Sequence, residues 1–285
     1  MSVVLITGCS SGIGLETALA FARRGDTAVA TMRNLAKADK LRERAAAENL
    51  DIMIERLDVN DDESVASCID SVTNQHGTVD ALVNNAGVGS RGPVETMSID
   101  NAAQLMDTNF WGPIRAIRAV LPAMRAQGSG VIINVSSLAS RVPAVSYTSM
   151  YAASKVALNA ISEALAGEVE PFGIRVVSIE PGFFETEIAA NNLSLDEEKS
   201  AAYAADHAWI QSFFEAGVGG GADASVVADA IVSAATDPAT RLHTTVGDDA
   251  AMYLDLLSQV DGYEGWMEAV MPLVESTVGP RPTPG

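Results

Sequence analysis

The chain alternates between short, continuously apolar runs and longer stretches in which apolar residues recur at helical spacing. The short runs are rich in Val, Ile and Leu, a composition typical of parallel strands buried on both faces. Seven runs predict strands: Val3–Thr7, Thr27–Met32, Ile52–Leu57, Ala81–Asn84, Val131–Val135, Ile174–Ile179 and His243–Val246. Helices are predicted between them, at about 14–24, 35–48, 62–75, 101–126, 151–170 and 224–236.

This alternation predicts an α/β fold with one doubly wound parallel sheet of about seven strands. Each helix must cross back over the sheet before the next parallel strand begins, so helices are expected on both faces. We expect this domain over residues 1–246, followed by a C-terminal helical appendage at 247–278. A flexible tail is expected at 279–285, which is rich in Pro and Gly.

Residues 183–222 differ from the rest because they contain aromatic side chains but no strand-like run. A long insertion after the carboxyl end of a strand is typical of a substrate lid, so we expect a helical lid that is mobile without ligand. The alternative is that aromatics such as Trp209 and Phe213 pack an ordinary helix onto the sheet. The glycines between 217 and 221 are expected to break that helix.

Charge and cysteine content exclude several classes of function. The chain has 37 acidic and 18 basic side chains, a net charge of −19, which repels nucleic acid and anionic membranes. Its two cysteines and three histidines lack metal-ligand spacing, so no metal is expected. Isolated thiols fit a reducing cytoplasm, and no signal peptide or membrane span is expected.

A glycine-rich loop joins the first predicted strand to the first predicted helix. Its sequence is Gly8-Cys9-Ser10-Ser11-Gly12-Ile13-Gly14. Backbone N–H groups at a helix N-terminus bind a pyrophosphate, and glycines let the backbone approach it closely. A plain glycine-rich turn would have the same composition, but this position in an α/β domain favours a dinucleotide site.

Tyr151 and Lys155 are four residues apart in a predicted helix, so their side chains share one face. A free tyrosine has a pKa near 10, and a neighbouring ammonium group together with an oxidised nicotinamide would lower it. The pair can therefore act as a general acid/base on an alcohol or carbonyl. A surface Tyr/Lys pair is the alternative.

Two serines end the fifth predicted strand, at the edge where such sheets bind ligands. A hydroxyl of Ser136 or Ser137 could donate to a substrate carbonyl oxygen as negative charge develops there. Ser140 is a more remote choice.

Four motifs occur together in this order: Thr7–Gly14, Asn84–Gly87, Tyr151 with Lys155, and Pro181-Gly182. In this combination the chain resembles the short-chain dehydrogenase/reductase family over about residues 2–190. The flanking sequences are similar to the 17β-hydroxysteroid and retinol dehydrogenase branch. The resemblance implies a Rossmann-like fold, a nicotinamide cofactor and association as a homodimer or homotetramer through the helices at 101–126 and 151–170.

The resemblance also implies a role for each matching residue. The catalytic residues would be Asn109, Ser137, Tyr151 and Lys155, although the spacing from Ser137 to Tyr151 is one residue longer than usual in the family. The carbonyl of Asn109 would hold a water beside Lys155; an asparagine in an apolar helix can also be a structural amide. The cofactor would contact Gly8, Ser10, Ser11, Gly12, Ile13, Gly14, Arg33, Asp58, Val59, Asn85, Ala86, Gly87, Tyr151, Lys155, Pro181, Gly182 and Thr186.

The end of the second strand bears on the choice of cofactor. Arg33 lies 19 residues beyond Gly14, where NAD-preferring enzymes of this architecture place a carboxylate for the ribose. The segment Thr31–Asn34 has no carboxylate, and Arg33 can bind a 2′-phosphate with help from Ser10 or Ser11. NADP(H) is therefore the expected cofactor, with NAD(H) possible. Alternatively Arg33 only opens the next helix, and Asp58 only caps the helix that follows it.

The sequence thus predicts an NADP(H)-dependent oxidoreductase that interconverts a ketone or aldehyde and an alcohol. The lid aromatics favour a small-molecule substrate that is a bulky, apolar alcohol or ketone. A non-catalytic NADP(H) sensor on the same fold would not need all four catalytic residues. A sugar-nucleotide epimerase would have the other glycine spacing and a larger C-terminal domain.

Overall fold

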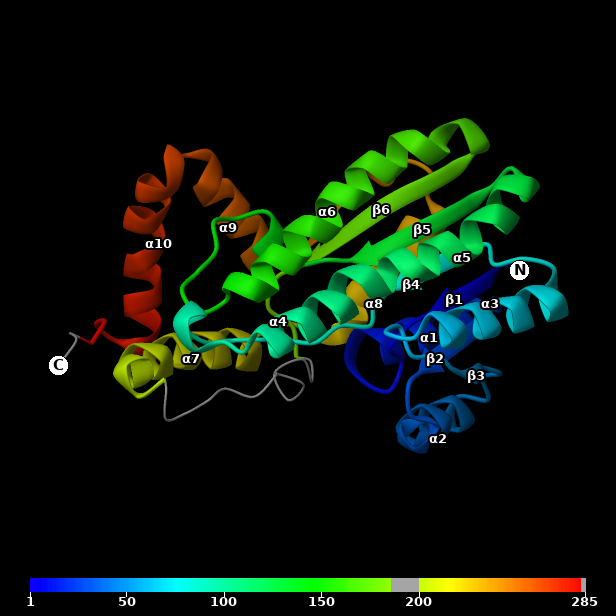
Figure 1. Cartoon of the computed structure of the whole chain (residues 1–285), viewed down its shortest axis with the longest axis horizontal. Coiled ribbons are helices and arrows are strands. Elements are labelled where there is room, and N and C mark those ends of the chain that lie inside the picture. The colour runs from blue at the N-terminus through cyan, green and yellow to red at the C-terminus, as the bar shows by residue number, and fades with distance from the viewer. Residues whose placement is uncertain (186–199, 283–285) are drawn as a thin grey trace.

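Seven parallel strands form one sheet through the centre of the protein (Figure 1). The computed structural model describes residues 1–185 and 200–282. The strands are β1 Val3–Ile6, β2 Thr27–Met32, β3 Met53–Arg56, β4 Ala81–Asn84, β5 Gly130–Val135, β6 Ile174–Pro181 and β7 His243–Val246. Their order is β3-β2-β1-β4-β5-β6-β7, and the paired strands are parallel throughout. The predicted doubly wound α/β fold is confirmed.

Helices cover both faces of this sheet. They are α1 Gly12–Arg23, α2 Asp39–Ala47, α3 Asp62–His76, α4 Ile99–Met106, α5 Gly112–Gln127, α6 Ser149–Val169 and α8 Ala224–Thr236. On one face α1 and α8 pack on the strands through Leu15 and Val227. On the other face α3, α5 and α6 pack through Ile69, Ile117 and Leu165. Burial on both faces explains why the strands have no polar alternation.

Helical structure is present over the predicted residues 101–126, but it is not one regular α-helix. Five residues, Asp107–Trp111, form a π-helical segment between α4 and α5. Gly112 follows it and lies so close to α3's leading loop that a Cβ there would be 2.9 Å from the Cβ of Val59. Pro113 at the start of α5 has no N–H to leave unpaired. Such single π turns occur often at functional sites.

Three further helices lie together beyond one end of the sheet: α7 Ala204–Gly219, α9 Asp248–Ser258 and α10 Gly262–Val278 (Figure 1). They share an apolar cluster that includes Trp209, Phe213, Tyr253 and Trp266. The interpretation that Trp209 and Phe213 pack a helix onto the sheet is therefore wrong, since they pack helix against helix. The glycines at 217–221 end this helix as predicted, because α7 stops at Gly219.

The end of the chain is tied to α7. The indole N–H of Trp209 donates to the carbonyl of Gly279 (2.8 Å), and Arg281 forms a bidentate ion pair with Asp206 (2.7 Å for both bonds). These contacts hold the first residues of the segment expected as a flexible tail; residues 283–285 lie outside the described part. No helix in the described ranges is long and apolar enough to cross a membrane.

Candidate active site

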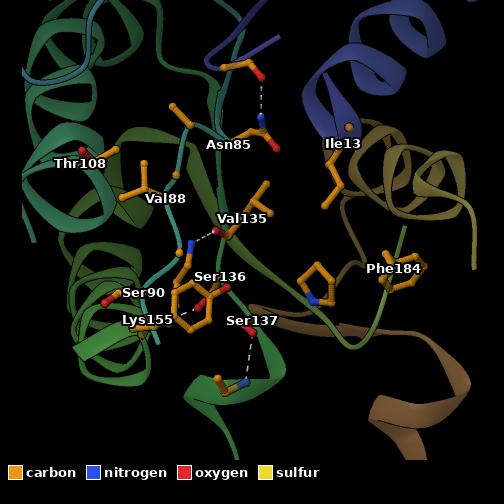
Figure 2. Close-up of a pocket in the computed structure, with 18 of the residues that line it drawn as sticks. Ile13, Asn85, Val88, Ser90, Thr108, Val135, Ser136, Ser137, Lys155 and Phe184 are labelled. Carbon is orange, nitrogen blue, oxygen red and sulfur yellow. Dashed lines mark hydrogen bonds between the residues drawn. The ribbon is translucent and has the colours of Figure 1, made fainter. Parts of the chain in front are cut away.

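A cavity of about 720 Å³ opens at the carboxyl ends of the strands, where the strand order reverses between β1 and β4. Open α/β sheets bind ligands at this crossover, and the volume is in the usual range for such sites. The lining includes most residues predicted for the cofactor and three of the four predicted for catalysis. Figure 2 shows the part of the wall that carries Ser136, Ser137, Lys155 and Phe184.

The glycine loop forms the floor at the β1 end of this cavity. Gly8 has a φ of +76°, and a Cβ there would lie 2.8 Å from the Cα of Ala86. At Gly14 a Cβ would lie 2.4 Å from the carbonyl oxygen of Gly8 and 2.4 Å from Nδ2 of Asn85. Only glycine fits at these two positions, so the loop folds back tightly and leaves the start of α1 open toward the cavity.

Asn85 and Thr7 lock this loop to the end of β4. The Asn85 side chain donates to the carbonyls of Thr7 (2.8 Å) and Gly8 (3.2 Å). The hydroxyl of Thr7 accepts from the backbone N–H groups of Asn85 and Ala86, both at 3.0 Å. Asn85 lines the cavity, but its amide is occupied by the loop itself.

Two cations and one carboxylate lie at the far end of the cavity from the Tyr/Lys pair. Arg33 and Lys37 are exposed and line it, and Asp58 is half-buried beside them in the lining. The interpretation of Asp58 as a helix cap is wrong: Asp61 caps α3, accepting from the N–H groups of Glu63 and Ser64. Lys37 is a site candidate that the sequence reasoning missed, although its position four residues beyond Arg33 could have indicated it.

Tyr151 and Ser137 meet at the centre of the cavity. A hydrogen bond from Ser137 and the charge of Arg91 lower the pKa of the Tyr151 phenol, but burial raises it more, so the net direction is upward. The predicted depression of this pKa is therefore absent in the protein alone. Ser137 Oγ also accepts from the N–H of Ala139 (3.1 Å), which sets its position (Figure 2).

Ser136 also lines the cavity, but its hydroxyl is engaged by neighbouring protein groups. Its hydroxyl donates to Ser140 Oγ (3.2 Å) and to the carbonyl of Lys155 (3.3 Å), and the residue is buried. Ser140 in turn donates to the carbonyl of Ser137 (2.6 Å). Of the three serines left open by the sequence, only Ser137 is hydrogen-bonded to the tyrosine.

Lys155 is buried, and its ammonium group donates to the carbonyl of Val135 at the end of β5 (2.9 Å; Figure 2). Nζ lies 5.8 Å from the centre of the Tyr151 ring, one turn away on α6. Burial lowers the pKa of Lys155 to about 8. The ammonium is therefore close to titrating at neutral pH in the protein alone.

Asn109, in the π-helical segment, is buried and fully engaged by protein groups. Its amide donates to the carbonyl of Val88 (3.0 Å) and to Ser154 Oγ (3.1 Å), and its Oδ1 accepts from the N–H of Val88 (2.9 Å). These bonds hold the segment that follows Gly87 against α6. The structural use of the side chain is thus observed.

Pro181 and Gly182 end β6 and line the cavity. A Cβ at Gly182 would lie 2.2 Å from a carboxylate oxygen of Asp249, so this side chain would have to move and give up its hydrogen bond from the N–H of Phe183 (2.7 Å). Asp249 thereby joins this turn to the start of α9. Thr186, the remaining predicted cofactor residue, lies outside the described residues.

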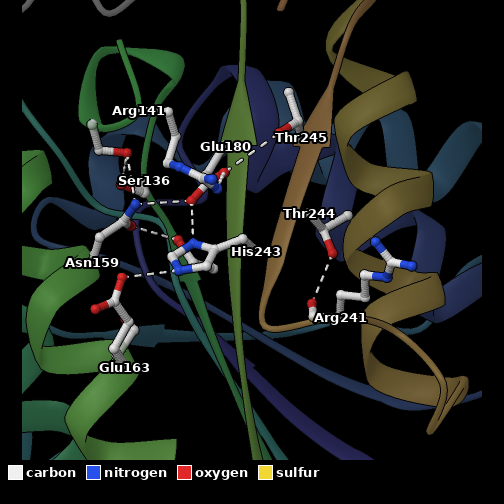
Figure 3. A network of polar contacts seen from close by, with 12 residues as sticks. Ser136, Arg141, Asn159, Glu163, Glu180, Arg241, His243, Thr244 and Thr245 are labelled. Atoms are coloured by element: carbon white, nitrogen blue, oxygen red, sulfur yellow. Dashed lines mark hydrogen bonds and ion pairs between the residues drawn. The ribbon is translucent and has the colours of Figure 1, made fainter. Parts of the chain in front are cut away.

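A buried carboxylate that the sequence reasoning missed supports the site from behind (Figure 3). Glu180 is fully buried and accepts from Arg141 Nη1 (2.8 Å) and Asn159 Nδ2 (2.8 Å), and it contacts His243 Nδ1 at 2.6 Å. A buried charge requires such partners. Because Arg141 follows the Ser137 loop and Asn159 lies on α6, this network fixes the two elements that carry the serine and the tyrosine.

The other half of the cavity is apolar. Its wall comes from the loop after β5 and from α7, α9 and α10, and includes Val142, Val145, Phe213, Phe214, Tyr253 and Trp266. One charged side chain, Arg91, also lines the cavity here, stacked 4.2 Å from the ring centre of Phe214. In the described residues no group of His, Cys, Asp and Glu is arranged to hold a metal ion.

Comparisons with known proteins agree with this geometry. The short chain dehydrogenase family matches residues 2–197. Retinol dehydrogenase 8 of Bos taurus is 46% identical over 189 residues, which are 65% of this chain and 59% of that protein. The human 17-beta-hydroxysteroid dehydrogenase type 1 is 38% identical over 205 residues, 69% of this chain and 61% of that protein. The chain therefore spans about three fifths of these relatives, and the resemblance to this branch is confirmed.

Solved structures extend the likeness over the rest of the chain. A short-chain dehydrogenase from Streptomyces avermitilis is 33% identical, with a TM-score of 0.79 covering 97% of this chain and 98% of that one. A gluconate 5-dehydrogenase from Burkholderia cenocepacia, solved with NADP and tartrate, is 29% identical, with a TM-score of 0.71 covering 88% and 95%. The chain thus belongs to the short-chain dehydrogenase family.

Proposed function

We propose that this protein is an NADP(H)-dependent oxidoreductase that interconverts a ketone or aldehyde and the corresponding alcohol, with Tyr151 as proton donor and acceptor. The observation that carries the proposal is the contact of Ser137 with the Tyr151 phenol in the cavity that also contains the glycine loop. Lys155 lies one turn from Tyr151, at the same wall.

The residues around the glycine loop fit a dinucleotide, since glycines stand where a Cβ would block the approach to α1. Gly8, Ser10, Ser11, Gly12, Ile13 and Gly14 would hold the pyrophosphate and its ribose, and Asp58 and Val59 the adenine. Ala86, Gly87, Pro181, Gly182 and Thr186 would hold the nicotinamide half, with Asn85 keeping the loop in shape. When bound, the cofactor supplies or accepts the hydride.

In the reducing direction, Tyr151 donates its phenolic proton to the carbonyl oxygen of the substrate. Ser137 donates a hydrogen bond to the same oxygen as negative charge develops. Burial keeps Tyr151 protonated in the protein alone, which suits a proton donor, while Arg91 and the Ser137 hydrogen bond oppose that rise in pKa. Lys155 binds the ribose and holds a positive charge near the phenol, and the backbone carbonyl of Asn109 positions a water beside Lys155.

Arg33 is proposed to select NADP(H), with Lys37 as a second cation for the 2′-phosphate. Both line the adenosine end of the cavity, and Asp58 is the one carboxylate among the described residues of the lining. The NADP bound by the gluconate 5-dehydrogenase supports this choice. NAD(H) remains usable, since these cations add affinity for the phosphate without blocking the hydroxyl.

We also propose the domain organisation and assembly expected from the sequence. Residues 1–246 would form the catalytic domain with a lid at 183–222, and 247–278 the helical appendage that completes the apolar wall. Ala153, Ala160 and Ala164 are exposed on one face of α6 and Val156 is half exposed, which suits a homodimer or homotetramer. Cys9 and Cys68 are free thiols, consistent with a location in the cytoplasm.

The test is Tyr151→Phe, which removes the proton donor and keeps the ring. We expect turnover of a ketone panel with NADPH to fall to below about one per cent, with the Kd for NADPH within about twofold of wild type. Tyr253→Phe is the matched control, because Tyr253 also lines the cavity and should keep its activity. Retention of activity in Tyr151→Phe would show that the proton comes from another group.

A further inference from the structure

Arg91 is the charged residue of the cavity wall for which the proposed chemistry gives no contact with substrate or cofactor. Five charged side chains line the cavity in the described residues: Arg33, Lys37, Asp58, Arg91 and Lys155. Arg33, Lys37 and Asp58 lie at the adenosine end, and Lys155 belongs to the reacting centre. Arg91 lies on the apolar side, in a protein with a net charge of −19. A cation kept there attracts anions that the rest of the molecule repels.

The contacts of Arg91 leave part of its guanidinium available. One nitrogen, Nη1, donates to Oε1 of Gln211 on α7 (3.0 Å), and the plane of the group stacks on Phe214. Within the described residues no carboxylate forms an ion pair with it; Glu215 is held instead by Gln211 Nε2 (2.9 Å). A guanidinium stacked on an aromatic ring still presents its edge, which matches a carboxylate in a bidentate geometry.

Burial without an ion-pair partner has a cost that a bound anion would offset. Burial lowers the pKa of Arg91, and the charges of Tyr151 and Glu215 oppose this only as secondary causes. His207, which lies near enough for Arg91 to lower its pKa, adds no negative charge. The group therefore stands partly desolvated and poorly compensated, beside a wall that includes Phe213, Phe214 and Val218.

We propose that Arg91 anchors a carboxylate of the substrate, so that the enzyme prefers ketones or alcohols that combine an apolar body with an acidic group. This inference rests on the proposed function, and it narrows the expected apolar substrate to an amphipathic acid. A carboxylate is favoured over a phosphate because a single guanidinium in apolar surroundings matches one negative charge. The carboxylate would lie between Phe214 and the reacting carbonyl near Tyr151.

The test uses two series of ketones, one built on benzophenone and one on acetophenone. Each ketone is assayed unsubstituted, with a para-carboxamide and with a para-carboxylate. Within a series, the carboxamide and the carboxylate have nearly the same shape and differ in charge. Wild type should reduce at least one carboxylate with a kcat/KM about tenfold to a hundredfold above its carboxamide, the range expected for a charge-assisted hydrogen bond. In Arg91→Met this ratio should fall to near one. In Arg91→Lys it should be intermediate, since the charge remains without the fork.

Two control variants separate this role from a structural one. Gln211→Leu removes the bond between Arg91 and α7 but keeps the charge, so it should retain the preference for the acid. Lys37→Met removes a cation at the adenosine end and should weaken NADPH binding without changing the ratio. Equal loss in Gln211→Leu and Arg91→Met would overturn the inference, because Arg91 would then act only by holding α7.

A binding measurement keeps the inference testable without turnover. The protein saturated with NADP⁺ is titrated calorimetrically with para-benzoylbenzoate and with the carboxamide. Tighter binding of the acid that is lost in Arg91→Met supports the anchor. Equal Kd values for the two probes in wild type, or no change in the variant, overturn it. Failure of the proposed function looks different: either no probe is reduced, or Tyr151→Phe reduces the probes as fast as wild type.

Discussion

The two halves of the cavity are built by different means. Around β1 and β4 the wall is backbone: Gly8 and Gly14 allow no side chain, and the Thr7 hydroxyl and Asn85 amide are used to hold the loop. Around α7, α9 and α10 the wall is apolar side chain, with Phe213 and Trp266 buried in one cluster. A backbone site recognises what all dinucleotides share, whereas a side-chain site can change its specificity one residue at a time.

This contrast predicts where substitutions are tolerated. In the backbone half, adding one atom meets main chain that cannot move, so small changes should be severe. In the side-chain half, a substitution changes the shape or charge of one patch and leaves the rest of the fold in place. Arg91 illustrates this: it lies in the same cavity as the glycine loop, yet its contacts are with side chains of α7.

The largest effect is expected from Gly14→Val. Its Cβ would lie 2.4 Å from the carbonyl oxygen of Gly8, a backbone atom held by Asn85, so the loop or the start of α1 must shift. We expect the Kd for NADPH to rise at least about a hundredfold, measured by NADPH fluorescence. Gly167→Ala is the control: nothing lies within 4 Å of the new Cβ on the exposed face of α6, and helix propensity favours alanine. Unchanged NADPH binding in Gly14→Val would contradict the backbone description.

The same contrast explains how far the sequence predicts this molecule. Strands buried on both faces are continuous apolar runs, so β2, β4 and β7 have the predicted bounds Thr27–Met32, Ala81–Asn84 and His243–Val246. The glycine loop can be predicted because positions that have no room for a Cβ must be glycine, and the spacing of these glycines is visible in the sequence. The π turn at Asp107–Trp111 was not, since it depends on packing against a distant loop.

The side-chain half was the hardest to predict, for a physical reason. Arg91 gains its meaning from Phe214 and Gln211, more than a hundred residues away, and no local pattern encodes that contact. Glu180 directly follows the predicted strand Ile174–Ile179, and nothing local in the sequence indicates that it is the fully buried centre of a network. The spacing of Tyr151 and Lys155 predicted their shared face, but not that burial raises the pKa of the tyrosine.

Arg33→Ala tests whether the adenosine end discriminates between cofactors by charge. Loss of a charge-assisted hydrogen bond to the 2′-phosphate should lower the kcat/KM ratio of NADPH to NADH about tenfold to a hundredfold. Lys37→Ala should lower it less, and the double variant more than either. Equal kcat/KM for the two cofactors in wild type, or an unchanged ratio in Arg33→Ala, would remove Arg33 as the selector.

Lys155 should make cofactor binding depend on pH. Its pKa is lowered to about 8 by burial, and the protonated form binds the anionic cofactor better, so affinity is constant below that value and declines above it. We expect the Kd for NADPH at pH 9 to be about tenfold above its low-pH plateau at constant ionic strength. Lys155→Met should bind more weakly at neutral pH and show no such rise. A flat profile in wild type would place the ammonium outside the binding equilibrium.

The smallest effect is expected from the hydrogen bonds of Asp206, which connect α7 to neighbouring segments at the apolar half of the cavity. Asp206 on α7 accepts from both Arg281 (2.7 Å) and the Tyr147 phenol (2.6 Å). The Arg281 hydrogen bonds, with that of Tyr147, lower the pKa of Asp206, while burial and then Asp206 raise the pKa of Tyr147 to about 12. The carboxylate's contribution to stability is therefore complete above its unfolded pKa near 4 and is lost as pH falls through the lower folded value. The phenol's contribution is complete below about pH 10 and is lost as pH rises toward 12.

Asp206→Asn should flatten both edges of this stability profile. Because Arg281 is 45% exposed, the loss at neutral pH should be only about 1 kcal/mol, seen as a small decrease in Tm. Cofactor affinity should not change, because Asp206 joins α7 to Tyr147 and Arg281 and makes no contact with the glycine loop. Asp39→Asn is the control, because its exposed pair with Arg42 should leave the profile as it is. If Asp206→Asn leaves the pH profile of stability unchanged, the contacts of Asp206 add nothing to the stability of the folded state. The apolar cluster shared by α7, α9 and α10 would then hold the apolar half of the cavity in place without them.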